Sequence, residues 1–260
     1  MERTLPAALE PFRNRITATS MPFVRVTPAP QRPTQLWESK VGGHPYLPKD
    51  FPIPSAPDGR ELFFLAQINF SDVPPLPGFP ESGLLGFFIY DDDLYGMNFE
   101  EGTTPDHFRV LFFPEVTHDT AALRHDFPTD RQADELPHHP ERSFPLQFER
   151  AEEVAPVSDY RFWEAFGQDF FQQFGTEAWS VLEEYDKAVS AQGHKLGGYA
   201  YFTQDDPRSA DDPMLLLFQL DSDQPMDLMW GDTGVGHFFI READLLKRDF
   251  TKVWFDWDGM

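Results

Sequence analysis

The sequence predicts an α+β fold rich in β-structure: internally duplicated, mixed or antiparallel β units with a few helices packed on them. Three observations predict it. Short sequence blocks recur in the same order in the two halves of the chain. The 25 prolines and 17 glycines are typical of many turns and short strands. Clear helical spacing of aromatic residues is confined to one long stretch, residues 159–192.

Five sequence blocks occur twice. The first begins at Lys40 and returns at Lys195, and each lysine stands two residues before a Gly-Gly pair. An apolar run ending in glutamine follows, at Gln67 and at Gln219. The other blocks are 83–89 and 234–240, the Asp-Leu pairs 93–94 and 244–245, and the aromatic segments 108–113 and 250–255. Five blocks in one order favour duplication over chance.

Local patterns predict the elements before and within the first copy. Residues 2–17 carry large apolar residues at helical spacing, with Pro6 suited to a first turn, and predict a short helix. Residues 21–33 hold four prolines, which favour an extended edge strand or a wrapping arm. Residues 62–70 are apolar on both faces up to Gln67, so we predict a strand buried between layers. Residues 84–90 predict another such strand.

The same patterns predict one compact domain over residues 1–260. Its first repeat lobe covers about 37–113, and a poorly patterned connector covers 114–157. A helical segment follows over 158–192, where Gly175 separates two helices that we expect to pack on the sheet. The second repeat lobe covers about 194–258.

The chain is strongly acidic, with a formal net charge of −23. This charge repels phosphate, so nucleic acids and anionic membrane surfaces are excluded as expected partners, whereas a basic protein would be attracted. The charge can equally serve to keep a chain with 27 phenylalanines soluble. No stretch has the ~18 apolar residues of a membrane helix, and residues 1–20 lack the core of a signal peptide. A cytoplasmic protein is predicted.

The glycine pairs and the matched glutamines are candidate binding residues. Bare backbone at a Gly-Gly turn can approach a ligand, but such glycines more often permit a tight turn. The residues concerned are Lys40, Gly42 and Gly43 in the first copy and Lys195, Gly197 and Gly198 in the second. Gln67 and Gln219 form either a polar clip that fixes strand register or a pair of amides facing one central cleft.

A third group of candidates lies near the C-terminus. Trp230 can cover a pocket beside a tight turn, and Asp232 with His237 can form an acid–base pair, although a structural turn explains the same pattern. The histidines His138 and His139 match no zinc-site spacing, and the acidic clusters match no calcium loop. The chain has no cysteine. We therefore expect no metal and no cofactor.

Several motifs together make the chain resemble the YwqG family, a bacterial group defined by a domain of unknown function. The motifs that carry this resemblance are residues 39–48, 65–70, 83–89, 197–198 with 201–208, 229–234 and 249–258. The resemblance implies a mixed, β-rich fold built by duplication, and no settled activity. Because members of the family are associated with bacterial toxin genes, it also suggests a toxin-neutralising role.

These observations lead to three hypotheses about function. The first is a non-enzymatic acidic interaction protein, in its sharpest form a toxin-immunity protein with a basic toxin as partner. The second is a small-molecule binding protein whose pocket lies between the two copies. The third, ranked last, is a hydrolase-like enzyme that uses Asp232 and His237.

Overall fold

The computed structural model describes residues 4–97, 106–127 and 135–259. Its strands form one ten-stranded sheet in the order β10-β9-β8-β7-β1-β6-β2-β3-β4-β5, and every pairing is antiparallel. The strands are β1 (Met21–Pro28), β2 (Lys40–Gly42), β3 (Phe63–Asn69), β4 (Leu84–Ile89), β5 (Phe108–Phe113), β6 (Ser143–Glu153), β7 (Lys195–Gly197), β8 (Leu215–Asp221), β9 (Val235–Ile240) and β10 (Trp254–Asp258). The β-rich α+β fold is therefore confirmed.

Helices are few and short. The α-helices are α1 (Arg13–Thr17), α2 (Tyr160–Phe166), α3 (Ala178–Ala188) and α4 (Glu242–Lys247). Short 3-10 helices are η1 (Ala7–Phe12), η2 (Phe70–Asp72), η3 (Thr120–Ala122), η4 (Phe170–Glu177), η5 (Gln224–Met226) and η6 (Phe250–Lys252). Gly175 has φ +58° at a kink inside η4, shortly before α3 begins, which is where the sequence predicts the break between two helices. No helix in the described part of the chain is long and apolar enough to cross a membrane.

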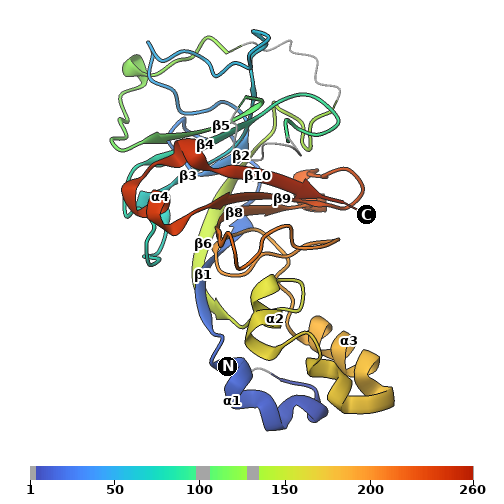
Figure 1. Ribbon diagram of the computed structural model, residues 1–260. Coiled ribbons are helices and arrows are strands. Elements are labelled where there is room, and N and C mark those ends of the chain that lie inside the picture. Colours follow the sequence, from blue (N-terminus) through green and yellow to red (C-terminus); the bar gives the residue numbers. More distant parts are fainter. Residues whose placement is uncertain (1–3, 98–105, 128–134, 260) are drawn as a thin grey trace.

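The sheet folds over so that its two halves face each other. The first half is β2 to β5 and the second half is β7 to β10, and Figure 1 shows them as two stacked layers. Aromatic rings fill the space between them: Phe87 lies 4.9 Å from Phe218 and 4.6 Å from Phe238, between ring centroids. All seven residues of β3 are buried, which confirms the prediction of a strand covered on both faces. Burial of this aromatic surface is the main source of stability.

The strands β1 and β6 lie at the centre of the sheet and exchange partners between its halves. β1 precedes the first half in sequence but pairs with β7, whereas β6 precedes the second half and pairs with β2. The prediction of an edge strand or wrapping arm over residues 21–33 is therefore wrong. Pro22 and Pro28 stand near the two ends of β1, so the intervening amides remain free to bond; Val26, for example, donates to the carbonyl of His194.

Equivalent strands of the two halves share one register. Lys40 pairs with Gln67 across β2 and β3, and Lys195 pairs with Gln219 across β7 and β8. A bulge interrupts β3 between Phe64 and Ala66 and interrupts β8 at the matching place, between Leu216 and Phe218.

The last repeated block is the exception to the sequence match. The sequence match aligns Arg109 with Thr251. In the structure, the equivalent residues Phe88 and Phe239 pair with Arg109 and with Trp254, so Arg109 corresponds to Trp254. Phe250 belongs to η6, and β10 begins only at Trp254. The predicted alignment of residues 108–113 with 250–255 is therefore wrong, because similar aromatic content in a short segment does not determine register.

The helices α2, η4 and α3 pack mainly on one another, so the prediction that they pack on the sheet is wrong. Their aromatic side chains form a separate core together with the N-terminal η1 and α1, at the end of the molecule below β1 and β6 in Figure 1. Phe162 is central to this core, 4.6 Å from Phe166 and 5.3 Å from Tyr185 between ring centroids. The hydroxyl of Tyr185 donates to Ala155 O just after β6, which joins the helices to the sheet.

Candidate functional site

The two matched glutamines are hydrogen-bonded in the same way. Gln67 Nε2 donates to the carbonyls of Leu36 and Glu38 at 2.7 and 2.8 Å, and its Oε1 accepts from Tyr46 N at 2.8 Å. Gln219 makes the equivalent set, with carbonyls 191 and 193 as acceptors and Tyr201 N as donor. Both side chains are fully buried, and each amide ties two flanking segments to its strand. These contacts are those of a polar clip, and the amides do not share a cleft.

The two matched lysines are both buried but differ in their partners. Lys195 Nζ lies 2.7 Å from Glu153 Oε2 in an ion pair, and both side chains are almost completely buried. Lys40 is 1% exposed, and its Nζ donates to the carbonyl of Gln35 at 2.8 Å, with Leu36 O at 3.5 Å. Among the described residues no carboxylate lies within ion-pair distance of Lys40.

The electrostatic consequence is a lysine that titrates near neutrality. Burial lowers the pKa of Lys40 to about 7, and the nearby Glu38 charge offsets only part of this effect. Burial also lowers the pKa of Lys195, where the Glu153 carboxylate opposes the shift. A buried amine with so perturbed a pKa marks a candidate functional position.

A cleft of about 840 Å³ opens beside Lys40. We call it the Lys40 cleft. Both apolar and polar side chains line it, and the lining residues used below are Pro33, Thr34, Lys40, Gly43, His44, Ile53, Glu61, Leu62, Phe63, Phe64, Phe88, Glu141, Ser143 and Asp227. Most of these residues lie on β2 to β4, in the loops next to these strands or in the segment that leads into β6. Packed aromatic rings fill the seam between the copies, so the Lys40 cleft, and not that seam, is the candidate pocket.

The glycine pairs shape the turns that follow the two lysines. All four glycines have positive φ, from +68° to +76°, a region that other residues rarely adopt. A Cβ on Gly42 would overlap the carbonyl oxygen of Arg142, and a Cβ on Gly198 would overlap Glu153 Oε1. In the first half, Gly43 and His44 line the Lys40 cleft. The structural role is therefore clear for all four, and of these glycines Gly43 also lines the Lys40 cleft.

The structure does not bring Asp232 and His237 together as an acid–base pair. Asp232 is exposed in its turn, and its carboxylate accepts from the hydroxyl of Thr233. His237 is fully buried in β9, its Nε2 lies 2.7 Å from Tyr201 O, and burial lowers its pKa to about 3. Trp230 is also fully buried, 5.1 Å from Tyr95 between ring centroids, and is part of the core between the layers. These contacts favour the structural interpretation of the motif.

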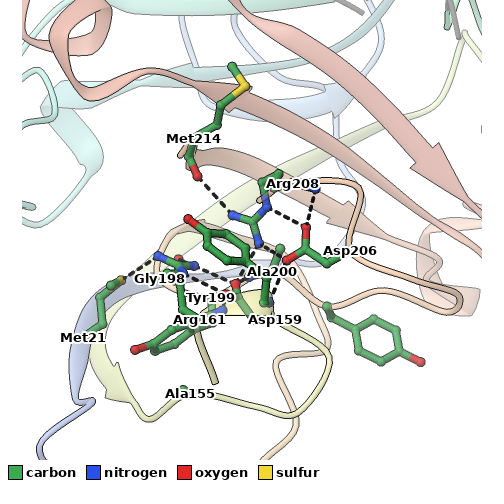
Figure 2. Close-up of polar contacts among 12 residues, drawn as sticks. Met21, Ala155, Asp159, Arg161, Gly198, Tyr199, Ala200, Asp206, Arg208 and Met214 are labelled. Atoms are coloured by element: carbon green, nitrogen blue, oxygen red, sulfur yellow. Dashed lines mark hydrogen bonds and ion pairs between the residues drawn. The ribbon is translucent and has the colours of Figure 1, made fainter. Parts of the chain in front are cut away.

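Sequence reasoning missed a buried ion network on the second half (Figure 2). Asp159, with no exposed surface, accepts from Arg161 Nη2 at 2.6 Å and from Arg208 Nη2 at 2.7 Å. Arg208 also pairs with Asp206 at 2.9 Å and donates to Met214 O. The paired guanidinium groups hold the pKa of Asp159 at about 2 despite its burial. The network joins the start of α2 to the loop before β8, and all its groups have partners, which indicates a structural role.

Near this network, Asp256 is a largely buried carboxylate with no ion-pair partner in the described part of the chain. Burial, with the charges of Asp258 and Asp206, raises its pKa to about 7, and Arg208 only partly opposes this. A carboxyl group whose pKa is raised in the folded state binds more protons there than in the unfolded chain. Its contribution to stability is therefore greatest below pH 4 and is lost as the pH rises through 7.

We therefore predict that Asp256→Asn makes the protein more stable at pH 8, by about 1–3 kcal/mol, and has a smaller effect at pH 5. Urea unfolding at the two pH values measures this difference. The matched control is Asp232→Asn, which removes an exposed carboxylate and should leave stability within about 0.5 kcal/mol at both pH values. Equal effects of Asp256→Asn at both pH values would contradict the assignment.

No group of three or more potential metal ligands occurs among residues 4–97, 106–127 and 135–259. His138 is buried and its Nδ1 lies 3.2 Å from His139 O, whereas His139 is exposed. Burial lowers its pKa.

Comparison with known families places the chain in a group without an assigned activity. Residues 39–259 match the family described as a domain of unknown function (DUF1963), and the chain belongs to this family. Among curated proteins none matches.

Proposed function

We propose that this member of the DUF1963 family is a small-molecule binding protein whose ligand occupies the Lys40 cleft. The observation that carries the proposal is a buried amine, with no carboxylate partner in the described residues, at the wall of a cleft of about 840 Å³. Ligand pockets of this size, largely apolar with a few polar groups, are typical of sites for small organic molecules.

The cost of burying Lys40 supports a role beyond folding. A buried amine that is not ion-paired destabilises the folded state. Lys195, the equivalent lysine of the second half, offsets this cost through its ion pair with Glu153. Residues that reduce stability in this way are retained most often where a site needs them.

A thermal-shift screen against a broad panel of metabolites tests the proposal. A ligand that binds the folded state raises the melting temperature by mass action, by an amount that grows with its concentration. Thr34→Trp, which places a large side chain at the cleft wall, should abolish the shift. Thr27→Trp is the matched control, because Thr27 is exposed on β1 and lies outside the Lys40 cleft. A flat response across the panel, or a shift that survives Thr34→Trp, would overturn the proposal.

A second candidate is an acidic interaction protein, and the specific observation that favours it is the net charge of −23. Charge of this magnitude accelerates encounter with a basic partner. The YwqG resemblance refines this candidate to a toxin-immunity protein. Co-purification with a candidate basic toxin and rescue of toxin-arrested cells would support it, and the absence of both would remove it.

We also infer that the two halves of the sheet arose by duplication of a five-strand unit. In support, the lysine–glutamine pairing, the bulge and the exchanged strands β1 and β6 all recur at equivalent places. Each unit would then comprise one exchanged central strand and the four strands of one half.

A further inference from the structure

The second half of the sheet contains a carboxylate-binding position that its own chain occupies. Glu153 Oε2 accepts from Lys195 Nζ at 2.7 Å, and Glu153 Oε1 accepts from the main-chain N–H of Tyr199, also at 2.7 Å. The carboxylate lies against Gly198, where any side chain would overlap it. The ring of Phe23 closes one side, with its centroid 4.8 Å from Lys195 Nζ. A lysine, a main-chain N–H and a glycine thus hold one carboxylate.

The first half repeats the framework of this position. Lys40 corresponds to Lys195, because both pair with the clip glutamine, and Gly43 and His44 follow at the same spacing as Gly198 and Tyr199. Gly43 shares the left-handed backbone of Gly198, with φ +73° against +76°. The main-chain N–H of His44, unlike that of Tyr199, has no acceptor among the described residues.

The groups that fill and close the position in the second half are missing from the first. Gly197 pairs with Phe23 in the second half, and the equivalent Gly42 pairs with Ser143 in the first half. The first half therefore has a small hydroxyl side chain at the position of the phenyl ring in the second half. Phe23 of β1 and Ser143 of β6 are thus equivalent positions. Glu153 lies ten residues after Ser143, so the residue equivalent to Glu153 is the one ten after Phe23, which is the uncharged Pro33. Pro33, Lys40, Gly43, His44 and Ser143 all line the Lys40 cleft. The framework is therefore open to the cleft.

We propose that this first-half position binds the carboxylate of an apolar organic acid, which takes the place that Glu153 fills in the second half. This inference rests on the proposed function and names the class of its ligand. Lys40 Nζ and the N–H of His44 hold the carboxylate, and the hydroxyl of Ser143 lies beside Gly43 in the same cleft. The bound anion supplies the missing counter-charge for Lys40, whose pKa burial lowers in its absence.

The rest of the cleft selects the remainder of the ligand. Its apolar wall suits an aliphatic or aromatic body and includes Ile53, Leu62, Phe63, Phe64 and Phe88. Three carboxylates also line the cleft, those of Glu61, Glu141 and Asp227, and Asp227 is paired with Arg142 at 2.8 Å. Their charge disfavours a second anionic group on the ligand. The expected class is a monocarboxylic acid with an apolar chain or ring.

Calorimetric titration with matched probes tests the inference on the intact protein. The probes are octanoate and 3-phenylpropanoate, their neutral amides, and 3-phenylpropylamine as a cation of the same shape. We expect each acid to bind at least about tenfold more tightly than its amide, as a charge-assisted hydrogen bond provides. Lys40→Met should remove this preference. Equal binding of acid and amide, or preference for the amine, overturns the inference and leaves the proposed function intact; if no probe binds and the metabolite panel is also flat, both are overturned.

A second variant serves if Lys40→Met does not fold. Pro33→Glu supplies a carboxylate from the position that corresponds to Glu153, so it should compete with the acids and weaken their binding at least about tenfold. Pro30→Glu is the matched control, because it adds the same charge at an exposed proline that does not line the cleft. Acid binding that is unchanged in Pro33→Glu, or weakened equally in Pro30→Glu, overturns the inference.

Discussion

Replacing Arg208 with methionine is expected to lower the free energy of unfolding by about 3–5 kcal/mol. The guanidinium group is completely buried and contacts two carboxylates, those of Asp159 and Asp206, at 2.7 and 2.9 Å. Methionine has a similar volume but no charge, so the loss comes mainly from carboxylates left with fewer partners in a buried environment. The carbonyl of Met214 would also lose its donor. Urea unfolding followed by circular dichroism measures the change.

The matched control for Arg208→Met is Arg241→Met. Arg241 pairs with Asp212 at 2.7 Å, but the two side chains are 42% and 58% exposed. An exposed pair of this kind contributes less than about 1 kcal/mol, because water solvates both charges when the pair is broken. Similar losses in the two variants would show that burial of the Arg208 network does not determine its energetic importance.

Gly42→Ala is expected to destabilise the protein by about 3 kcal/mol or more. Two effects add at this position. The backbone has φ +68°, which costs a residue with a Cβ about 1–2 kcal/mol, and the new methyl group would overlap the carbonyl oxygen of Arg142. Because β2 pairs with β6 through Gly42 and Ser143, the overlap separates the strands at the centre of the sheet. Chemical denaturation measures the loss, and insoluble expression would be its extreme form.

Gly59→Ala separates the two effects. Gly59 also has positive φ, +87°, but nothing lies within 4 Å of the position that a Cβ would occupy. Only the cost of placing a residue with a Cβ at positive φ applies there, so we expect the free energy of unfolding to fall by about 1–2 kcal/mol. If Gly42→Ala costs no more than Gly59→Ala, the close approach of Arg142 is not energetically important.

The features that the sequence predicted well are those set by local pattern. Residues 62–66 and 84–89 lack polar positions on either face, so any fold must cover both sides of these strands, and β3 and β4 are buried throughout. The helical break at Gly175 follows from its backbone freedom in the same local way. Gln67 and Gln219 could be recognised because a buried amide must satisfy its hydrogen bonds wherever the chain places it.

The candidate site depended on partners that are distant in sequence. No local pattern distinguishes Lys40 from Lys195, because the difference lies in Glu153, which comes 42 residues before Lys195 and which β6 brings to it across the central strands. The arginine–aspartate network of Asp159 and Arg208 likewise joins residues 49 apart.

The sequence by itself determined which segments are buried strands, where helices break and which amides require partners, since these depend on residue type and spacing within a few positions. The tertiary structure alone decided that β1 and β6 exchange between the halves, that the seam is filled with aromatic rings, and that one of two matched lysines faces an open cleft. The physical reason is that burial and electrostatic pairing depend on distances through space, and strand pairing sets these distances between residues that local sequence does not relate.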